Sequence, residues 1–324
     1  MNILVTGGAG YIGSHVVKQL GESTNANVTV LDNFSTGHKE AVLFGNVVEM
    51  ELSDFQRVQN FLNNGNFDVV IHFAASIIVP ESVENPLKYY LNNTVNTTNL
   101  IDASVKSGVR KFIFSSTAAV YGEPDSETVR EDMSTNPINP YGMSKLMSET
   151  VLRDASLAHK DFKHVILRYF NVAGADTKNR IGQSFPNATH LIKVAAETAL
   201  RKRKSISIFG TDFDTPDGTG IRDYIHVDDL ASAHLEAIKY LDKYDSNTFN
   251  CGYGRGYSVK EVLNTMKKVS GVDFNVIETG RRSGDPGTLI ANNAKILKHT
   301  HWKPHYDNLE LICKTALEWE KKLK

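Results

Sequence analysis

Short apolar runs alternate with longer amphipathic stretches over the first half of the chain. The apolar runs predict strands at 2–6, 28–31, 46–49, 68–73, 111–115 and 164–169. The stretches between them carry apolar residues at helical spacing, and we expect helices at 11–20, 54–63, 87–107 and 141–158. This alternation predicts a doubly wound α/β fold, a parallel (Rossmann) sheet with helices on both faces. Ligands of such sheets bind beyond the carboxyl ends of the strands.

The pattern changes after Asn171. A polar, loop-like segment at 172–185 precedes a predicted helix at 188–202, a strand at 205–209 and a long polar turn at 210–220. Further helices are expected at 228–240, from the capping box at 258–261 to Gly271, and from a related pair, Asp307 and Glu310, onward. We predict a larger domain of residues 1–171 plus 223–249 and a smaller α/β domain of residues 172–222 plus 250–324.

Composition narrows the class of protein. The 324 residues are 41% hydrophobic and 23% charged, which is ordinary for a globular protein. The net charge of −1 lacks the basic footprint of a nucleic-acid-binding protein, so no nucleic-acid partner is expected. The densest basic run, 201–204, is expected to end a helix and face solvent.

Targeting and redox signals point to the cytoplasm. The two cysteines, Cys251 and Cys313, are far apart and without metal-like spacing, which favours a reducing compartment and predicts no metal site. Apolar runs stay short of the 18–20 residues that a membrane span needs. Because the first predicted strand starts at residue 2, no signal peptide is expected.

A glycine-rich turn follows the first predicted strand. Gly8, Gly10 and Gly13 fit G-x-G-x-x-G, and Gly7, Gly10 and Gly13 fit G-x-x-G-x-x-G. Glycines here allow a tight turn and let backbone N–H groups and a helix N-terminus approach a pyrophosphate. Asp32 ends the second predicted strand about 20 residues later, where a carboxylate binds the ribose hydroxyls of a dinucleotide. A carboxylate there would repel a 2′-phosphate, so the sequence predicts NAD as the cofactor.

Tyr141 and Lys145 form the candidate catalytic pair. Of the twelve tyrosines, only Tyr141 has a lysine four residues later, and on a helix these positions share a face. The preceding Asn139-Pro140 places Tyr141 in the first helical turn. An ammonium about 4 Å from the phenol, at an effective dielectric near 20, would supply roughly 4 kcal/mol toward lowering its pKa from about 10 to near neutrality. We therefore expect Lys145 to lower the pKa of Tyr141 so that it serves as a general base.

Motifs along the whole chain resemble the extended short-chain dehydrogenase/reductases, and within them the UDP-glucose (UDP-galactose) 4-epimerase family. The superfamily resemblance rests on 6–15, Asp32-Asn33, 72–75, 115–117, 120–122, 141–145 and 167–174. The more specific resemblance rests on 208–210, 217–227 and 281–286 in the second half. It implies that a tyrosinate removes the sugar 4-hydroxyl proton while NAD takes the C4 hydride. The resulting 4-keto sugar turns over, and the hydride returns to its other face. It also implies a cofactor that stays bound, and a homodimer.

The resemblance assigns a role to each candidate residue. Tyr141, Lys145 and Thr117 are implied to be catalytic, with Thr117 bound to the 4-oxygen. Lys145 is also implied to bind the nicotinamide ribose. The other implied cofactor-binding residues are Gly7, Gly10, Tyr11, Ile12, Gly13, Asp32, Asn33, Glu51, Leu52, Phe73, Ala74, Ala75, Asn92 and Tyr169. Those implied to bind the UDP-sugar, beside Thr117, are Asn171, His190, Leu191, Phe209, Arg222, Arg282, Asp285 and Leu289. The larger domain would thus bind NAD and the smaller one UDP.

Three departures from the family pattern bear on function. Ser76-Ile77 replaces a segment that carries a cofactor-facing lysine in some relatives, and Glu51-Leu52 stands where Asp-Ile commonly meets adenine. Leu289 occupies a position that a bulky Tyr fills in some relatives restricted to plain hexoses. The smaller side chain leaves room near C2, so we expect UDP-GlcNAc and UDP-GalNAc to be substrates as well.

Other functions remain open from the sequence. A UDP-uronate 4-epimerase would need a further cation near C6, which the sequence does not locate. A dehydratase needs an acid after Thr117, where this chain has Ala118-Ala119. An NAD(H)-sensing regulator would have no need of Tyr141 and Lys145, and for a simple alcohol dehydrogenase the arginines of the second half would be superfluous.

Overall fold

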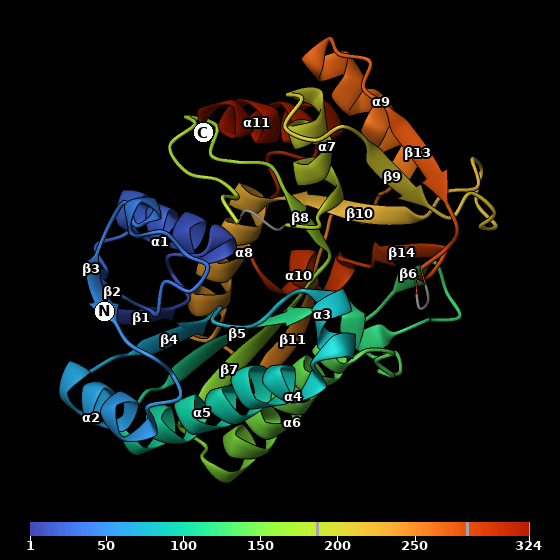
Figure 1. Cartoon of the computed structure of the whole chain (residues 1–324). Helices are drawn as coiled ribbons and strands as arrows, with labels where there is room; N and C mark the ends of the chain where they lie inside the picture. Colours follow the sequence, from blue (N-terminus) through green and yellow to red (C-terminus); the bar gives the residue numbers. More distant parts are fainter. Residues whose placement is uncertain (186–187, 283–284, 324) are drawn as a thin grey trace.

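A seven-stranded parallel sheet forms the centre of the computed structural model, which describes residues 1–185, 188–282 and 285–323 (Figure 1). Its strand order is β11-β7-β5-β4-β1-β2-β3. The strands are β1 (Asn2–Thr6), β2 (Asn27–Asp32), β3 (Asn46–Glu49), β4 (Val69–His72), β5 (Lys111–Thr117), β7 (Lys163–Tyr169) and β11 (Asn247–Cys251). The order reverses between β1 and β4, which is where a doubly wound sheet binds ligands. The predicted fold class is confirmed.

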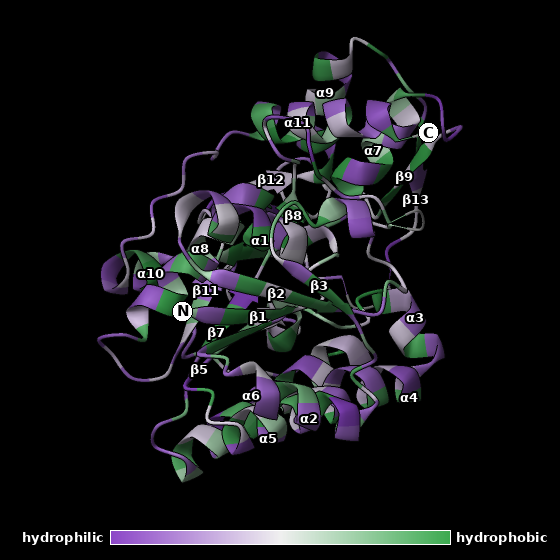
Figure 2. Cartoon of the chain, turned by 90° about the vertical axis from the view of Figure 1, so that its left-hand side faces the viewer, coloured by the Kyte–Doolittle hydropathy of each residue, from purple (hydrophilic) through white to green (hydrophobic). Residues whose placement is uncertain are grey.

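Helices cover both faces of this sheet. α1 (Tyr11–Ser23) and α8 (Val227–Tyr240) pack on one face, and α2 (Phe55–Gly65), α5 (Asn96–Lys106) and α6 (Pro140–Ala158) pack on the other. Short helices α3 (Val79–Glu84) and α4 (Pro86–Tyr89) lie beside α6. Because both faces are buried, the inner strands are almost continuously apolar, and they appear green in Figure 2.

The second half, joined by β6 from the first half, builds a smaller α/β unit, which occupies the upper and right-hand part of Figure 1. Its strands are β6 (Thr128–Val129), β8 (Asn171–Ala173), β9 (Ile206–Phe209), β10 (Ile221–His226), β12 (Gly256–Ser258), β13 (Val276–Thr279) and β14 (Thr288–Ala291). Its helices are α7 (Leu191–Ala199), α9 (Val259–Ser270) and α11 (Leu309–Lys322). β10 is central to it, because it pairs with β8, β12 and β14.

The predicted domain limits cut across some of these elements. The limits at 222/223 and 249/250 fall inside β10 and β11. The short helix α10 (Ala294–His299) and Trp302 pack with the core of the large sheet, although the prediction gives them to the smaller domain. The division of the chain into two domains therefore remains a prediction.

Helix ends were predicted best where a local cap marks them. Asn139 caps α6 through Gly142 N, and Ser258 and Glu261 form a capping box that opens α9, which ends at Gly271 as predicted. At α11 the prediction was wrong, because Asn308, not Asp307, accepts the first-turn N–H from Leu311.

Three predicted segments differ in the structure. The single helix expected at 87–107 is α4, a π-helical segment η2 (Tyr90–Val95) and α5 in succession. The helix expected at 188–202 is shortened to α7. The segment expected to be a loop from residue 172 begins inside β8, because Val172 and Ala173 find pairing partners in β10, far along the chain.

Candidate functional site

The glycine turn after β1 forms a close-packed cradle at the switch point of the sheet. Gly7 has φ +71°, and a Cβ there would lie 2.6 Å from Ala74 N. A Cβ on Gly13 would lie 2.3 Å from Gly7 O, so only glycine lets α1 approach the turn. Gly10 caps α1 without a side-chain hydrogen bond, and a Cβ there would meet only Gly7 O, at 3.3 Å. An open approach to uncapped helical N–H groups fits the pyrophosphate of NAD.

The predicted ribose and adenine residues lie together beside this turn. Asp32 is buried, and its two carboxylate oxygens accept hydrogen bonds from Ala9 N and Phe34 N, each at 2.9 Å. Asn33 Nδ2 donates to both carboxylate oxygens of Glu51, at 3.1 and 3.0 Å. Leu52 is buried in the neighbouring apolar core. The carboxylate of Asp32 thus holds the glycine turn in place through Ala9. It also lies at the position that the sequence predicts to bind the ribose.

The middle of the predicted cofactor groove is made by the ends of β4 and β7 and by η2. The Phe73 ring lies 4.9 Å from that of His234, whose Nε2 is hydrogen-bonded to Tyr169 Oη. Ile12 packs against the same core. Asn92 lies on the π-helical segment and donates to Ser76 Oγ at 3.0 Å. Such π segments interrupt helices frequently at functional sites, and no sequence pattern predicted this one.

Tyr141 and Thr117 meet where β5 ends and α6 begins. Thr117 Oγ1 accepts from Ala119 N at 3.1 Å, and a Cβ on Gly142 would lie 2.7 Å from Ala119 O, so the two segments are in close contact. A hydrogen bond with the Thr117 side chain lowers the pKa of Tyr141, but burial outweighs it and raises the pKa above its ordinary value. The phenol of Tyr141 and the hydroxyl of Thr117 therefore lie at the same end of β5.

Lys145 is not among the groups that shift the pKa of Tyr141 in the protein without NAD, so its effect on the phenol stays a prediction for the complex. Lys145 Nζ donates to Ser115 O at 2.9 Å and lies 5.0 Å from the centroid of the Phe114 ring. Burial lowers the pKa of Lys145 to about 7. The prediction treated the ammonium as fully charged and partnered with the phenol, whereas the buried site disfavours charge on both groups.

A buried ion pair behind the catalytic pair was missed from sequence. Arg168 donates to Glu149 through Nε at 3.0 Å and Nη2 at 2.8 Å, and Ser116 Oγ donates to Glu149 Oε1 at 2.5 Å. Burial favours a neutral Glu149, but these bonds hold its pKa below the ordinary value. Ser116 precedes Thr117 on β5, and Glu149 lies one turn after Lys145 on α6. The hydrogen bond between Ser116 and Glu149 therefore fixes these two elements together. Glu149 and Arg168 lie on the consecutive elements α6 and β7 but share no local motif.

β10 links the predicted substrate residues. Tyr224 is paired with Asn171 of β8, and Arg222 is paired with Leu289 of β14. Arg222 Nη1 donates to Ile221 O at 2.8 Å and Gly287 O at 3.3 Å. Within the described residues no carboxylate lies within 4.0 Å of its guanidinium, and burial lowers its pKa. A cation held in protein without a paired anion suits a phosphate ligand.

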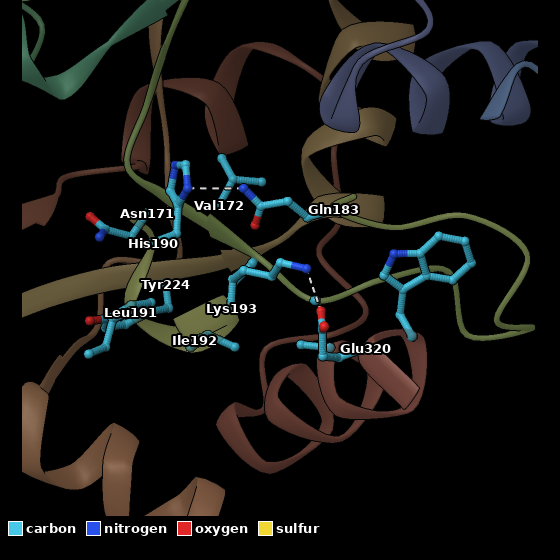
Figure 3. A pocket seen from close by; sticks show the side chains of 13 residues that line it. Asn171, Val172, Gln183, His190, Leu191, Ile192, Lys193, Tyr224 and Glu320 are labelled. Atoms are coloured by element: carbon cyan, nitrogen blue, oxygen red, sulfur yellow. Dashed lines mark hydrogen bonds and ion pairs between the residues drawn. The ribbon is translucent and has the colours of Figure 1, made fainter. Parts of the chain in front are cut away.

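Two further groups of predicted residues lie around this strand. Arg282 stacks over the Phe209 ring, with its guanidinium carbon 3.6 Å from the centroid, and Asp285 N donates to Arg282 O at 3.4 Å. Asn171, His190 and Leu191 line a small cavity between β8, α7 and α11 (Figure 3). Ser283 and Gly284, which belong to the 281–286 motif quoted above, lie outside the described residues.

Two polar contacts between side chains line the cavity. Gln183 Nε2 donates to His190 Nδ1 at 3.0 Å, and Lys193 is paired with Glu320 of α11 (Figure 3). Sequence analysis identified His190 but neither member of the ion pair, because Lys193 and Glu320 lie 127 positions apart in the chain. His190 therefore has a hydrogen-bonded position at the cavity wall.

Over residues 1–185, 188–282 and 285–323, no helix is long and apolar enough to cross a bilayer. The same ranges hold no group of three or more His, Cys, Asp or Glu side chains arranged to bind a metal ion.

The fold and the glycine cradle define a dinucleotide-binding protein of the doubly wound α/β class. The chain belongs to the NAD dependent epimerase/dehydratase family, whose model matches residues 3–252. It is 50% identical over 323 residues to a UDP-glucose 4-epimerase of Azospirillum brasilense, covering 99% of this chain and 92% of the relative.

Solved structures agree over the full length. A UDP-Glc/GlcNAc 4-epimerase from Campylobacter jejuni is 58% identical, with 99% of both chains covered and a TM-score of 0.88. A UDP-glucose 4-epimerase from Brucella ovis, solved in complex with NAD, is 41% identical, with 98% of this chain and 97% of that chain covered and a TM-score of 0.94. The resemblance inferred from the motifs is thereby confirmed.

Proposed function

We propose that this protein is an NAD-dependent 4-epimerase that interconverts UDP-glucose and UDP-galactose. The observation that carries the proposal is that the start of α6, which holds Tyr141, packs against the segment after Thr117 at the carboxyl end of β5, on the sheet whose β1 ends in the glycine cradle. This arrangement offers a proton-transfer group and a dinucleotide site at one edge of a parallel sheet. The full-length likeness to UDP-glucose 4-epimerases supports the choice of substrate.

The proton chemistry falls to Tyr141. NAD, when bound, supplies an acceptor and donor of hydride for carbon 4 of the sugar. Tyr141 Oη removes the proton of the 4-hydroxyl and returns it to the oxygen after the sugar has presented its other face. The hydroxyl of Thr117 binds the same oxygen. Because burial alone raises the pKa of Tyr141, the protonated amine of Lys145 is proposed to favour the phenolate when the positively charged nicotinamide is also bound.

The segment after Thr117 favours epimerisation over elimination of water. Ala118 and Ala119 begin the short 3₁₀ helix η3 (Ala118–Tyr121) and carry no acid. Ala118 is buried in an apolar cluster with Val120 and Phe170. Elimination needs a group that protonates the departing hydroxyl, and this cluster offers none at these positions.

The UDP part is proposed to bind along β10 and the cavity beside it. Arg222 and Arg282 would contact the diphosphate, with Asp285 beside them, and Phe209 would contact the uracil. Asn171, His190 and Leu191 would bind the nucleotide from the cavity. The support is that Arg222 has free N–H groups and is not ion-paired within the described residues.

A wider substrate range is proposed from Leu289. Its side chain packs beside the apolar cluster that contains Ala118, the residue after Thr117. A leucine there occupies less space than a tyrosine and leaves room for an N-acetyl group at C2. The relative from Campylobacter jejuni is named a UDP-Glc/GlcNAc 4-epimerase. We propose that UDP-GlcNAc and UDP-GalNAc are also interconverted.

A homodimer is proposed from an apolar stripe on one face of the large unit. Leu87, Leu91 and Val95 recur at helical spacing and are 71%, 61% and 39% exposed, and Met147 of neighbouring α6 is 42% exposed. A row of exposed large apolar side chains marks a protein interface. The occupant proposed is a second copy of this chain, paired through these helices.

A cytoplasmic location is proposed because both cysteines are free thiols.

The experiment for the central proposal follows the sugar itself. Purified protein is incubated with UDP-galactose without added NAD, and the products are followed by NMR. Formation of UDP-glucose up to a constant ratio is expected, because the reaction has no net redox change and the cofactor is retained. If UDP-galactose stays unchanged even after NAD is added, the proposal is wrong. UDP-GlcNAc is tested in parallel, and its inertness beside turnover of UDP-galactose would refute the wider range only.

A further inference from the structure

One face of α1 carries a row of polar side chains that contact α8 and the segment after β8. Tyr11, His15, Lys18 and Glu22 are spaced by four, three and four residues, which places them on a single face. All four bond to residues that lie more than 150 positions away in the chain. This polar face of α1 is unusual, because the helix otherwise packs through apolar residues against the core.

Tyr11 makes the contact nearest to the cofactor turn. Its Oη donates to Gly174 O at 2.7 Å. Gly174 follows β8 directly and has φ +89°, and a Cβ there would lie 2.6 Å from the His226 ring. Only glycine fits this turn, and the turn aims the carbonyl at Tyr11. Since Tyr11 follows Gly10, one hydrogen bond joins the glycine turn to the strand that carries Asn171.

The rest of the polar face fixes the following segment. Lys18 Nζ donates to Asp176 Oδ1 at 2.8 Å and to Asp228 Oδ1 at 2.6 Å, and all three side chains are at most 5% exposed. Further out, Arg180 Nη1 donates to Glu22 Oε1 at 2.5 Å, where both side chains are about one-third exposed. Residues 174–180 are thus held along the length of α1, most firmly where the charges are buried.

We propose that Tyr11 is a positioning residue that couples the cofactor turn to β8, so that UDP bound at Asn171 slows the release of NAD. The coupling rests on the proposed function, which assigns NAD to the turn and UDP to β8. A ligand that holds β8 also holds the Gly174 carbonyl, and through it the first turn of α1. Such coupling is reciprocal, so NAD also strengthens the binding of UDP.

The test measures loss of NAD from the purified holoenzyme with and without saturating UDP. Released NAD is separated by rapid filtration and quantified over time for the wild type, Tyr11→Phe, Glu22→Gln and Tyr244→Phe. Wild type, Glu22→Gln and Tyr244→Phe are expected to show the same slowing by UDP. Tyr11→Phe should show a slowing smaller by about fivefold, the worth of one ordinary hydrogen bond. Tyr244 is a matched control, because it is 53% exposed and lies past the C-terminal end of α8.

Two outcomes would overturn the coupling. One is a wild type whose release of NAD is indifferent to UDP, and the other is a Tyr11→Phe variant with the full wild-type effect. If Tyr11→Phe loses NAD during purification, the dissociation constant of UDP is measured with and without saturating NAD, where the wild-type ratio must exceed that of the variant. Turnover of UDP-galactose by the same wild-type preparation separates the two proposals, because a lack of turnover counts against the function and not the coupling.

Discussion

Replacing Arg222 with methionine separates a ligand-binding role from a structural one. Two of the guanidinium N–H contacts go to backbone carbonyls through Nη1. Nε and Nη2 have no bond among the described residues and are free for a phosphate. Methionine keeps much of the length of the side chain but removes the charge and all five donors.

The expected loss of affinity follows from those free donors. A hydrogen bond to a charged group contributes about 1.5–3 kcal/mol, which corresponds to a factor of about 10–150 in binding. We therefore expect KM for UDP-galactose and the dissociation constant of UDP to rise by that factor in Arg222→Met. Because Arg222 is proposed to contact the diphosphate and not the reacting carbon of the sugar, kcat should change much less.

The unfolding free energy, in contrast, is expected to change little. Burial already disfavours the charged guanidinium, as the lowered pKa of Arg222 indicates. Gly287 O also accepts from Ile221 N at 2.8 Å, so it keeps a partner after the substitution. The lost bonds and the relieved burial of charge nearly offset, and the unfolding free energy should stay within about 1 kcal/mol of the wild type.

The assay combines three measurements on one preparation. Initial rates give kcat and KM, isothermal titration with UDP gives affinity, and urea unfolding of the NAD-loaded protein gives stability. Arg57→Met, at an exposed position on α2, is the matched control. The reasoning is refuted if Arg222→Met unfolds more easily by over about 2 kcal/mol while its affinity for UDP is unchanged, since Arg222 would then be structural.

Three other perturbations have equally definite outcomes. Gly13→Ala forces a Cβ to 2.3 Å from Gly7 O, so NAD content after purification and stability should both fall, the latter by about 1–3 kcal/mol, whereas Gly280→Ala, with nothing within 4 Å, should leave both unchanged. Leu289→Tyr should abolish turnover of UDP-GlcNAc while UDP-galactose is still converted, as product analysis by NMR would reveal. In the NAD-free protein the pKa of Lys145 is about 7, below the 10.5 of the unfolded chain, so the unfolded state binds more protons between these values. Stability should therefore rise with pH across that window by at most about 5 kcal/mol, and urea unfolding of Lys145→Met should lack this rise.

Features that depend on short stretches of sequence were predicted well. The glycine turn needs residues without a Cβ at fixed spacing, and the structure has close contacts at Gly7 and Gly13. The start of α6 at Asn139-Pro140 is likewise local, because a cap and a preset φ act within one turn. Tyr141 was therefore placed correctly in the first turn of its helix.

Features that depend on pairing between distant segments were not predictable. β10 alternates poorly, because Asp223 is buried and accepts N–H bonds from Tyr253, Gly254 and Ala291. No periodicity rule marks a strand with a buried carboxylate. The raised pKa of Tyr141 was not predictable for a related reason. It depends on how many atoms from distant segments cover the phenol, whereas sequence spacing identifies only the nearest helical neighbours.

The most direct test of the account is the proton transfer assigned to Tyr141. Tyr141→Phe is purified as the holoenzyme, its NAD content and UDP affinity are measured, and its conversion of UDP-galactose is compared with that of wild type and Tyr244→Phe. The account predicts a loss of rate of at least about 10²-fold with NAD content and UDP affinity retained. A rate within a few-fold of the wild type would contradict it, because the phenol could not then be the group that moves the proton.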